Sequence, residues 1–277
     1  MNVLFLGDLV GEAIVPFLKK NLPPILKKYN ISFVIVNGEN LANGYGTTPE
    51  LCERLFEIGI NVISSGNHIW DQEKIIPYIA KQEGLLRPVN ESDAAPGNGF
   101  GSFFDKNGNK IVVINILCNL FMKKSKNAFT EIKKLLESFK LKNNCDAIFI
   151  DLHGETASEK QAFANMVDGK VTAVLGTHTH VPTSDLRLLP KGTAFQTDTG
   201  MCGDYDSVIG GDKHAWIKKF EINNSFERIN SSNSNIAICG AIIKVNKDSG
   251  LSTYVDQIII GKVLKNNVPS EQPFVVK

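Results

Sequence analysis

The 277-residue chain is long enough to bury a full hydrophobic core, and its composition, 43% hydrophobic and 21% charged, is that of a globular protein. Its 30 basic residues almost balance its 29 acidic residues, and a net charge of +1 argues against a protein that binds long nucleic acid. No apolar stretch reaches the roughly 18 residues of a membrane span, no export signal opens the chain, and the scattered cysteines indicate a reduced, cytoplasmic protein.

Short apolar runs alternate with helical patterns through the first two thirds of the chain. The runs are almost continuous in Val, Ile, Leu and Phe, which is typical of strands buried on both faces. The predicted strands are Val3–Leu6, Phe33–Val36, Asn61–Ser64, Ile111–Leu117, Ala147–Ile150 and Thr172–Leu175. Helical patterns cover about 12–29, 48–58, 71–82, 127–140 and 156–166, and prolines interrupt the first of them.

Beyond residue 185 the pattern becomes rich in strands. Four further strands are predicted, at Leu186–Leu189, Ala194–Thr197, Ile236–Val245 and Tyr254–Ile260, with one helical segment near 212–221. The Gly-, Asn- and Pro-rich stretch at 90–101 is typical of a surface loop rather than a domain boundary. We therefore predict one α/β domain over residues 1–277, built as a layered sandwich.

Residues that commonly bind metals follow five of the predicted strands. The five segments are Gly7-Asp8, Asn37-Gly38-Glu39-Asn40, Gly66-Asn67-His68, Asp151-Leu152-His153 and Gly176-Thr177-His178-Thr179-His180. They hold four of the five histidines of the chain. Because ligands bind at the carboxyl edge of open α/β sheets, we expect these side chains to converge.

The mixture of imidazoles and carboxylates favours Mn, Fe, Zn or Ni over Ca or Mg. The candidate ligands are too many for one tetrahedral ion and suit two ions that share a carboxylate. Two ions about 3.5–4 Å apart suit in-line displacement at phosphorus, with a nearby histidine as proton donor to the leaving oxygen. Taken alone, Asp8 is read more simply as a capping residue and His153 as a core histidine, so the prediction depends on the combination.

In this order, the segments resemble the motif series of calcineurin-like metallophosphoesterases over residues 1–183. The chain departs from that superfamily at Val10, where a histidine is usual, at Glu39, where an aspartate is usual, at Ile69, where an acid is usual, and at the additional Thr177. With these departures, the chain resembles the bacterial YmdB-like phosphodiesterases through about residue 260. Two later segments share that resemblance: Asp198-Thr199-Gly200-Met201 and Tyr205–Gly210.

The resemblance implies a four-layer αββα sandwich and a dinuclear site. Metal one would be held by Asp8, Glu39, Asn40 and His180. Metal two would be held by Glu39, Asn67, His153 and His178, so that Glu39 bridges the two ions. The resemblance further implies hydrolysis of 2′,3′-cyclic or 3′,5′-cyclic nucleotides by a metal-bridging hydroxide, with His68 as general acid, and iron as the metal, with manganese able to support turnover.

Substrate contacts are expected from the stretch Gly200–Gly211, where Gly203 would bring the backbone close to substrate and Tyr205 would stack on a base. The alternative for this stretch is a tight loop before a helix. Two other functions stay open: a phosphomonoesterase or protein phosphatase, and a metal-bearing regulatory protein with incidental turnover. The strand-rich C-terminal part also leaves a homo-oligomer open.

Overall fold

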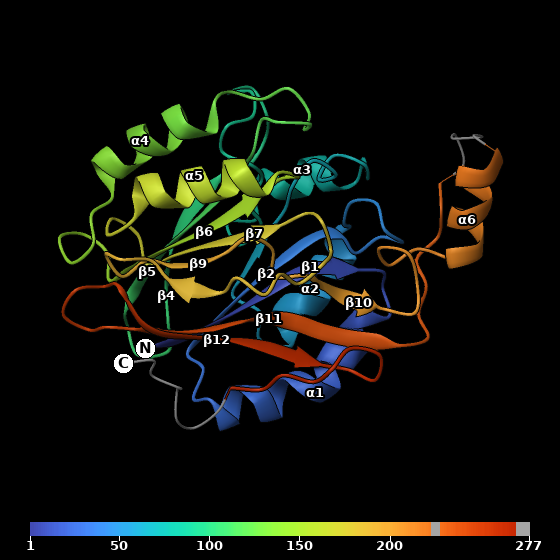
Figure 1. Ribbon diagram of the computed structural model, residues 1–277. Coiled ribbons are helices and arrows are strands. Elements are labelled where there is room, and N and C mark those ends of the chain that lie inside the picture. Colours follow the sequence, from blue (N-terminus) through green and yellow to red (C-terminus); the bar gives the residue numbers. More distant parts are fainter. Residues whose placement is uncertain (223–227, 270–277) are drawn as a thin grey trace.

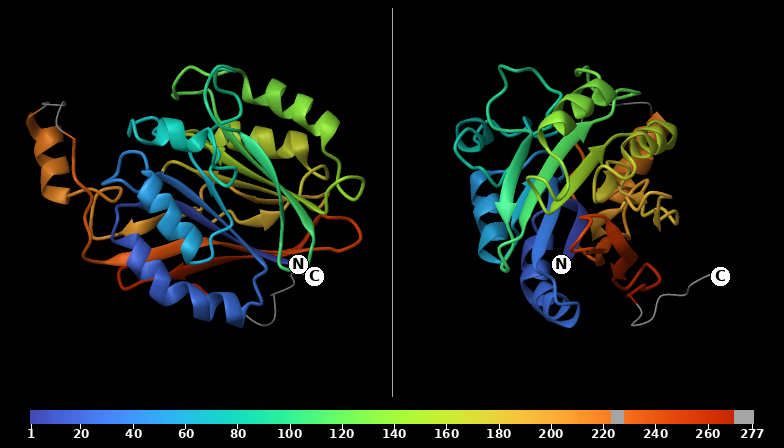
Figure 2. Two further views of the ribbon diagram at one scale, coloured as in Figure 1. Left: turned by 180° about the vertical axis from the view of Figure 1, so that it is seen from behind. Right: turned by 90° about the vertical axis from the view of Figure 1, so that its left-hand side faces the viewer.

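The computed structural model describes residues 1–222 and 228–269. Two six-stranded sheets lie face to face, and helices cover their outer faces (Figure 1). Figure 2 shows the same layers from behind and from one side. Among the described residues, no helix is long and apolar enough to cross a membrane.

The first sheet is built around its two earliest strands, which run parallel. Its strand order is β12 (Ser252–Ile260), β11 (Ile236–Val245), β10 (Met201–Asp204), β1 (Asn2–Val10), β2 (Phe33–Asn40) and β3 (Val62–Ser64). β10 pairs in parallel with the carboxyl end of β1, while β11 pairs antiparallel with its amino end. The outer face packs on α1 (Ile14–Lys28), α2 (Pro49–Glu57) and α3 (Ile75–Ile79).

The second sheet has a parallel centre with antiparallel edges. Its order is β4 (Phe100–Phe104), β5 (Lys110–Leu117), β6 (Ala147–His153), β7 (Ala173–Thr177), β9 (Ala194–Gln196) and β8 (Arg187–Leu188). Its outer face is covered by α4 (Ala128–Ser138) and α5 (Ala157–Val167). With the first sheet, these layers form the αββα sandwich that the sequence predicts.

Side-chain alternation explains why the central strands are apolar throughout. In β1, Val3 and Phe5 point between the sheets, where they join Val113 and Phe149 of the second sheet in one buried cluster. Leu4 and Leu6 point the other way, into the core shared with α1 and α2. Because successive residues of a strand face opposite sides, a strand between two layers is apolar at every position.

The structure differs from the predicted elements in two kinds of place. Helix α1 continues through Pro23 and Pro24, because both lie on its exposed face and the carbonyls left without amide partners can meet water. The short strands β4 and β10 are not among the predicted strands, and β4 begins inside the loop expected at 90–101. Both strands form by pairing with β5 and β1, which local sequence patterns do not reveal.

Helix α6 (Lys213–Ile222) stands apart from both sheets (Figures 1 and 2). All ten of its residues are described, and none of them is buried. It extends from the molecule beyond β10, on the side where the central strands reach their carboxyl ends.

Candidate metal centre

The predicted ligands lie at the ends of central strands from both sheets. Asp8 is near the end of β1, and Glu39 and Asn40 end β2 in the first sheet. His153 ends β6 in the second sheet, and His178 follows β7 directly. Asp8 and His153 have no exposed surface, although both are strongly polar. Buried polar groups of this kind are costly unless they are paired or bind a cation.

One group of ligand atoms converges on the ring of His153. Its Nε2 lies 3.0 Å from Glu39 Oε1, 3.2 Å from Asn67 Oδ1 and 3.1 Å from His178 Nδ1. Ligand atoms of Glu39, His153 and His178 all lie within 4.8 Å of one another. Gly66 permits this approach, because a Cβ there would lie 2.4 Å from both Glu39 Oε2 and His153 Nε2.

A second group lies beside the first and contains unpaired oxygens. Asp8 Oδ1 and Asn40 Oδ1 are buried and have no hydrogen-bond partner among the described residues. The amide nitrogen of Asn40 donates to Gly44 O at 3.1 Å, which fixes the side chain. His180 Nδ1 is bonded to Ile209 O at 2.8 Å, leaving Nε2 as the nitrogen able to bind a ligand. A bound cation would satisfy buried oxygens that lack a hydrogen-bond partner.

The electrostatics of the first group depend on the contact between Glu39 and His153. Burial opposes charge on both side chains, but each stabilises the charged form of the other. Burial would raise the pKa of Glu39, yet the charge and hydrogen bond of His153 lower it to about 2. Burial would lower the pKa of His153, yet Glu39 raises it to about 9. For Asp8 burial dominates, and its pKa is raised.

Thr177 and Asp151 fix the tautomer of His153. The Thr177 hydroxyl donates to Asp151 Oδ1 at 2.6 Å, and so it accepts from Nδ1 of His153 at 2.9 Å. Nε2 is then the unprotonated nitrogen of the neutral ring and faces the other ligands. A hydrogen bond of this kind orients a metal-binding imidazole. Thr177, the additional residue of the last motif, therefore serves to orient the ring of His153.

The backbone that carries His178 and His180 is strained and firmly held. Their φ values are 106° and 65°, a region that residues with a Cβ rarely adopt. The amide of His178 donates to Asp8 Oδ2 at 3.0 Å, and the amide of Thr179 donates to Asp198 Oδ2 at 3.0 Å. Asp198 is paired in turn with Lys160 at 3.1 Å, and both side chains are fully buried.

His68 lies at the cavity wall beside these groups. Its Nδ1 lies 2.8 Å from Asp71 Oδ2, so Nε2 is the nitrogen left to act on a ligand. Its backbone amide donates to Glu39 Oε2 at 3.1 Å, and its ring meets the ring of Tyr45 edge-on at 5.8 Å between centroids. The side chain of His68 is 30% exposed, which suits a proton donor that must reach a ligand.

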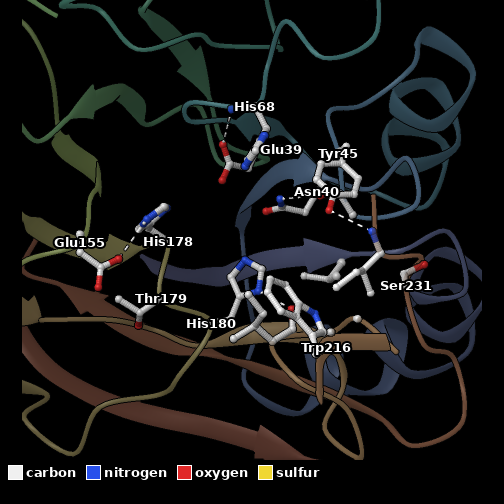
Figure 3. Close-up of a pocket in the computed structure, with 16 residues that line it drawn as sticks. Glu39, Asn40, Tyr45, His68, Glu155, His178, Thr179, His180, Trp216 and Ser231 are labelled. Carbon is white, nitrogen blue, oxygen red and sulfur yellow. Dashed lines mark hydrogen bonds and ion pairs between the residues drawn. The ribbon is translucent and has the colours of Figure 1, made fainter. Parts of the chain in front are cut away.

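Part of the predicted ligand set opens onto a cavity of about 380 Å³, within the usual size of a small-molecule site. Glu39, Asn40, His68, His178 and His180 line it (Figure 3). The cavity also includes Glu155, Tyr45, Trp216 and Ile229, which sequence reasoning did not single out. Of these, only Glu155 had a sequence signal, because it follows His153 by two residues; its Oε2 lies 3.2 Å from His178 Nε2.

The two predicted substrate contacts lie away from this cavity wall. The Tyr205 hydroxyl donates to His180 O at 3.2 Å and accepts from the Met201 amide at 3.0 Å, so it is used within the protein. Gly203 is buried in β10, where an added Cβ would lie 3.1 Å from Val10 Cβ. Neither residue is among those that line the cavity, and we leave both out of the proposed substrate site.

A two-sheet sandwich with acids, amides and imidazoles gathered at the ends of its central strands defines a metallophosphoesterase of the calcineurin-like superfamily. A family model described as a YmdB-like protein matches residues 4–258, and the chain belongs to this YmdB-like family.

Known proteins of similar sequence and structure match almost the whole length of this chain. The 2′,3′-cyclic-nucleotide 2′-phosphodiesterase of Bacillus subtilis is 36% identical over 260 residues, which cover 94% of this chain and 97% of that protein. A crystal structure of a novel phosphatase from Mycoplasma pneumoniae is 35% identical with a TM-score of 0.85, covering 94% of this chain and 93% of that one. A hypothetical protein from Thermus thermophilus is 32% identical with a TM-score of 0.86, covering 95% of this chain and 100% of that one. The prediction of an enzyme of the phosphodiesterase class is confirmed.

Proposed function

We propose that the chain is a dinuclear metal-dependent phosphodiesterase that hydrolyses cyclic nucleotides, with 2′,3′-cyclic nucleotides as the first candidates. The observation that carries the proposal is the convergence of Glu39, His153 and His178 together with the unpaired buried oxygens of Asp8 and Asn40. The name of the Bacillus subtilis relative supports the choice of substrate.

Glu39 is the proposed bridge, because one of its oxygens contacts His153 while the other accepts from the amide of His68. Asp8, Asn40 and His180 would complete one ion's ligands, and Asn67, His153 and His178 the other's. The nitrogen and oxygen donors suit iron or manganese. When bound, the two ions would activate a water molecule and neutralise the phosphoryl oxygens.

The chain's own residues supply orientation and a proton. The carboxylate of Asp71 holds the His68 ring through Nδ1. A proton on Nε2 would then pass to the leaving ribose oxygen as its bond to phosphorus breaks. Water supplies the new oxygen, so a cyclic diester yields a nucleoside monophosphate. Glu155 contacts Nε2 of His178 and would hold that ring toward His153.

The test compares several substrates on protein whose metal content is measured after loading with Mn or Fe. We expect cleavage of 2′,3′-cyclic AMP, slower cleavage of a bis-aryl phosphodiester, and little release of phosphate from an aryl monoester. Identifying the product as the 2′- or 3′-monophosphate shows which ribose oxygen leaves. A metal-loaded protein that cleaves no diester contradicts the proposal, and preferred cleavage of the monoester favours a phosphomonoesterase instead.

A small phosphodiester is thus the proposed partner. Cytoplasmic location, organisation as a single domain and assembly into a homo-oligomer stay predictions.

A further inference from the structure

The cavity has two chemically different sides. Glu155 and His178 lie on one side, and the proposed ligands Glu39, Asn40 and His180 also line the cavity. The other side contains Tyr45, Trp216 and Ile229, which come from the loop after β2, from α6 and from the segment after residue 227. Figure 3 shows Tyr45 across the cavity from Glu155 and His178, with Trp216 at the lower edge. We call Tyr45, Trp216 and Ile229 the aromatic wall.

Tyr45 is built firmly into this wall. Its hydroxyl accepts from the Ile229 amide at 3.3 Å, and its carbonyl accepts from Gln72 Nε2 at 2.7 Å. The guanidinium of Arg228 lies 4.9 Å from the centre of its ring. Tyr45 also touches the ring of His68 edge-on, so the wall begins next to the proposed proton donor. A ligand whose leaving oxygen meets His68 would therefore extend toward aromatic surface.

Trp216 has a position that packing of the core does not explain. It belongs to α6, none of whose side chains is buried, yet it lines the cavity. Gly211 makes room for it, because an added Cβ there would lie 2.6 Å from the indole Nε1. Phe220 is stacked with the indole at 5.6 Å between centroids and 23° between planes. The ammonium of Lys219 also lies 4.9 Å from the centre of the indole. Because the indole lines the cavity, the part of it that these neighbours leave uncovered offers aromatic surface to a ligand.

We propose, resting on the function proposed above, that the aromatic wall is the nucleobase subsite. The phosphate would lie on the metal-ligand side, and the base would stack against Trp216 and Tyr45. Stacking accepts any base, because every base has a π face. The wall would therefore select nucleotides over diesters that lack a base, without strong preference among bases.

The kinetic test uses Trp216→Ala, with Ile217→Ala as the matched control on the same helix. Ile217 is 50% exposed and does not line the cavity. Loss of one stacking contact should raise the KM for 2′,3′-cyclic AMP by at least about fivefold, with kcat within about twofold of wild type. The kcat/KM preference for 2′,3′-cyclic AMP over an abasic ribose 2′,3′-cyclic phosphate should fall by a similar factor, and I217A should match wild type.

A binding test is independent of turnover. Trp70 and Trp216 are the two tryptophans of the chain, so Trp70→Phe leaves Trp216 as the single tryptophan, whose emission can be excited selectively. Trp70 does not line the cavity. We expect adenosine 3′-monophosphate to quench this fluorescence with saturation, and inorganic phosphate to leave it unchanged.

The outcomes separate the two proposals. Wild-type cleavage of diesters with an unchanged KM in W216A overturns the nucleobase subsite and leaves the proposed function standing. Fluorescence that does not respond to the nucleotide, or responds equally to phosphate, also overturns the subsite. Saturable quenching by the nucleotide in a protein that cleaves no diester supports the subsite and overturns the proposed function.

Discussion

Replacing Lys160 with methionine should destabilise the protein strongly, because it breaks a buried ion pair beneath the proposed metal centre. Lys160 Nζ lies 3.1 Å from Asp198 Oδ2 and 2.7 Å from Thr177 O, and neither charged side chain has exposed surface. Removing one partner of a buried pair typically costs about 3–5 kcal/mol, since the other charge stays buried. Two amides, those of Thr179 and Gly200, still donate to Asp198. We therefore expect K160M to lower the free energy of unfolding by about 3 kcal/mol.

Urea unfolding of the chelated, metal-free proteins measures this loss without the contribution of bound metal. The double variant K160M/D198N should recover part of the loss, because no unpaired charge remains. Lys142 and Asp146 form a half-exposed pair, so K142M is the matched control and should cost less than about 1 kcal/mol. A K160M protein within about 1 kcal/mol of wild type, or a double variant no more stable than K160M, would refute the reasoning.

His68→Ala should lower kcat by roughly 10²- to 10⁴-fold while metal content, measured by elemental analysis, stays at the wild-type level; loss of metal would contradict its role as acid. Glu39→Gln should reduce the content of both ions, because Glu39 belongs to both proposed ligand sets, and a loss of one ion alone would argue against bridging. Burial raises the pKa values of Cys52, Cys118 and Cys239 to about 12. These thiols should react with a disulfide reagent only after unfolding, and rapid reaction of the native protein would contradict their burial.

The ligand positions could be predicted from sequence because each is tied to the end of a strand. Asp8, Glu39 and His153 follow apolar runs that are recognisable by composition, and the topology of parallel strands brings such ends to one edge. His178 and His180 are separated by one residue, as are two side chains that share one face of an extended segment. The structure instead gives both residues positive φ values, so their rings are placed by a strained turn rather than by strand alternation.

The other residues that line the cavity could not be predicted, because contacts between distant segments of the chain bring them together and local sequence patterns do not reveal such contacts. Tyr45 and Ile229 are 184 positions apart and meet through one hydrogen bond. Trp216 lies on a helix with no buried side chain, so the helical periodicity of the sequence does not single it out from its neighbours. The stacking role predicted for Tyr205 gains no support from the cavity lining, and its hydroxyl is bonded to the His180 carbonyl and lies 3.3 Å from Cys239 Sγ in β11.

Hydrogen bonds between buried polar side chains of the two sheets, below the ligands, hold the sheets in a fixed relative position. Asp151 of the second sheet accepts from Asn37 of β2 at 2.8 Å and from Ser64 of β3 at 2.5 Å. The same carboxylate accepts from Thr177, which orients His153. Because a buried carboxylate without such donors would be costly, the sheets cannot slide past each other without losing these bonds. The imidazoles of the second sheet are thereby held opposite the acids of the first, which makes the ligand geometry a property of the sheet-to-sheet packing rather than of either sheet alone.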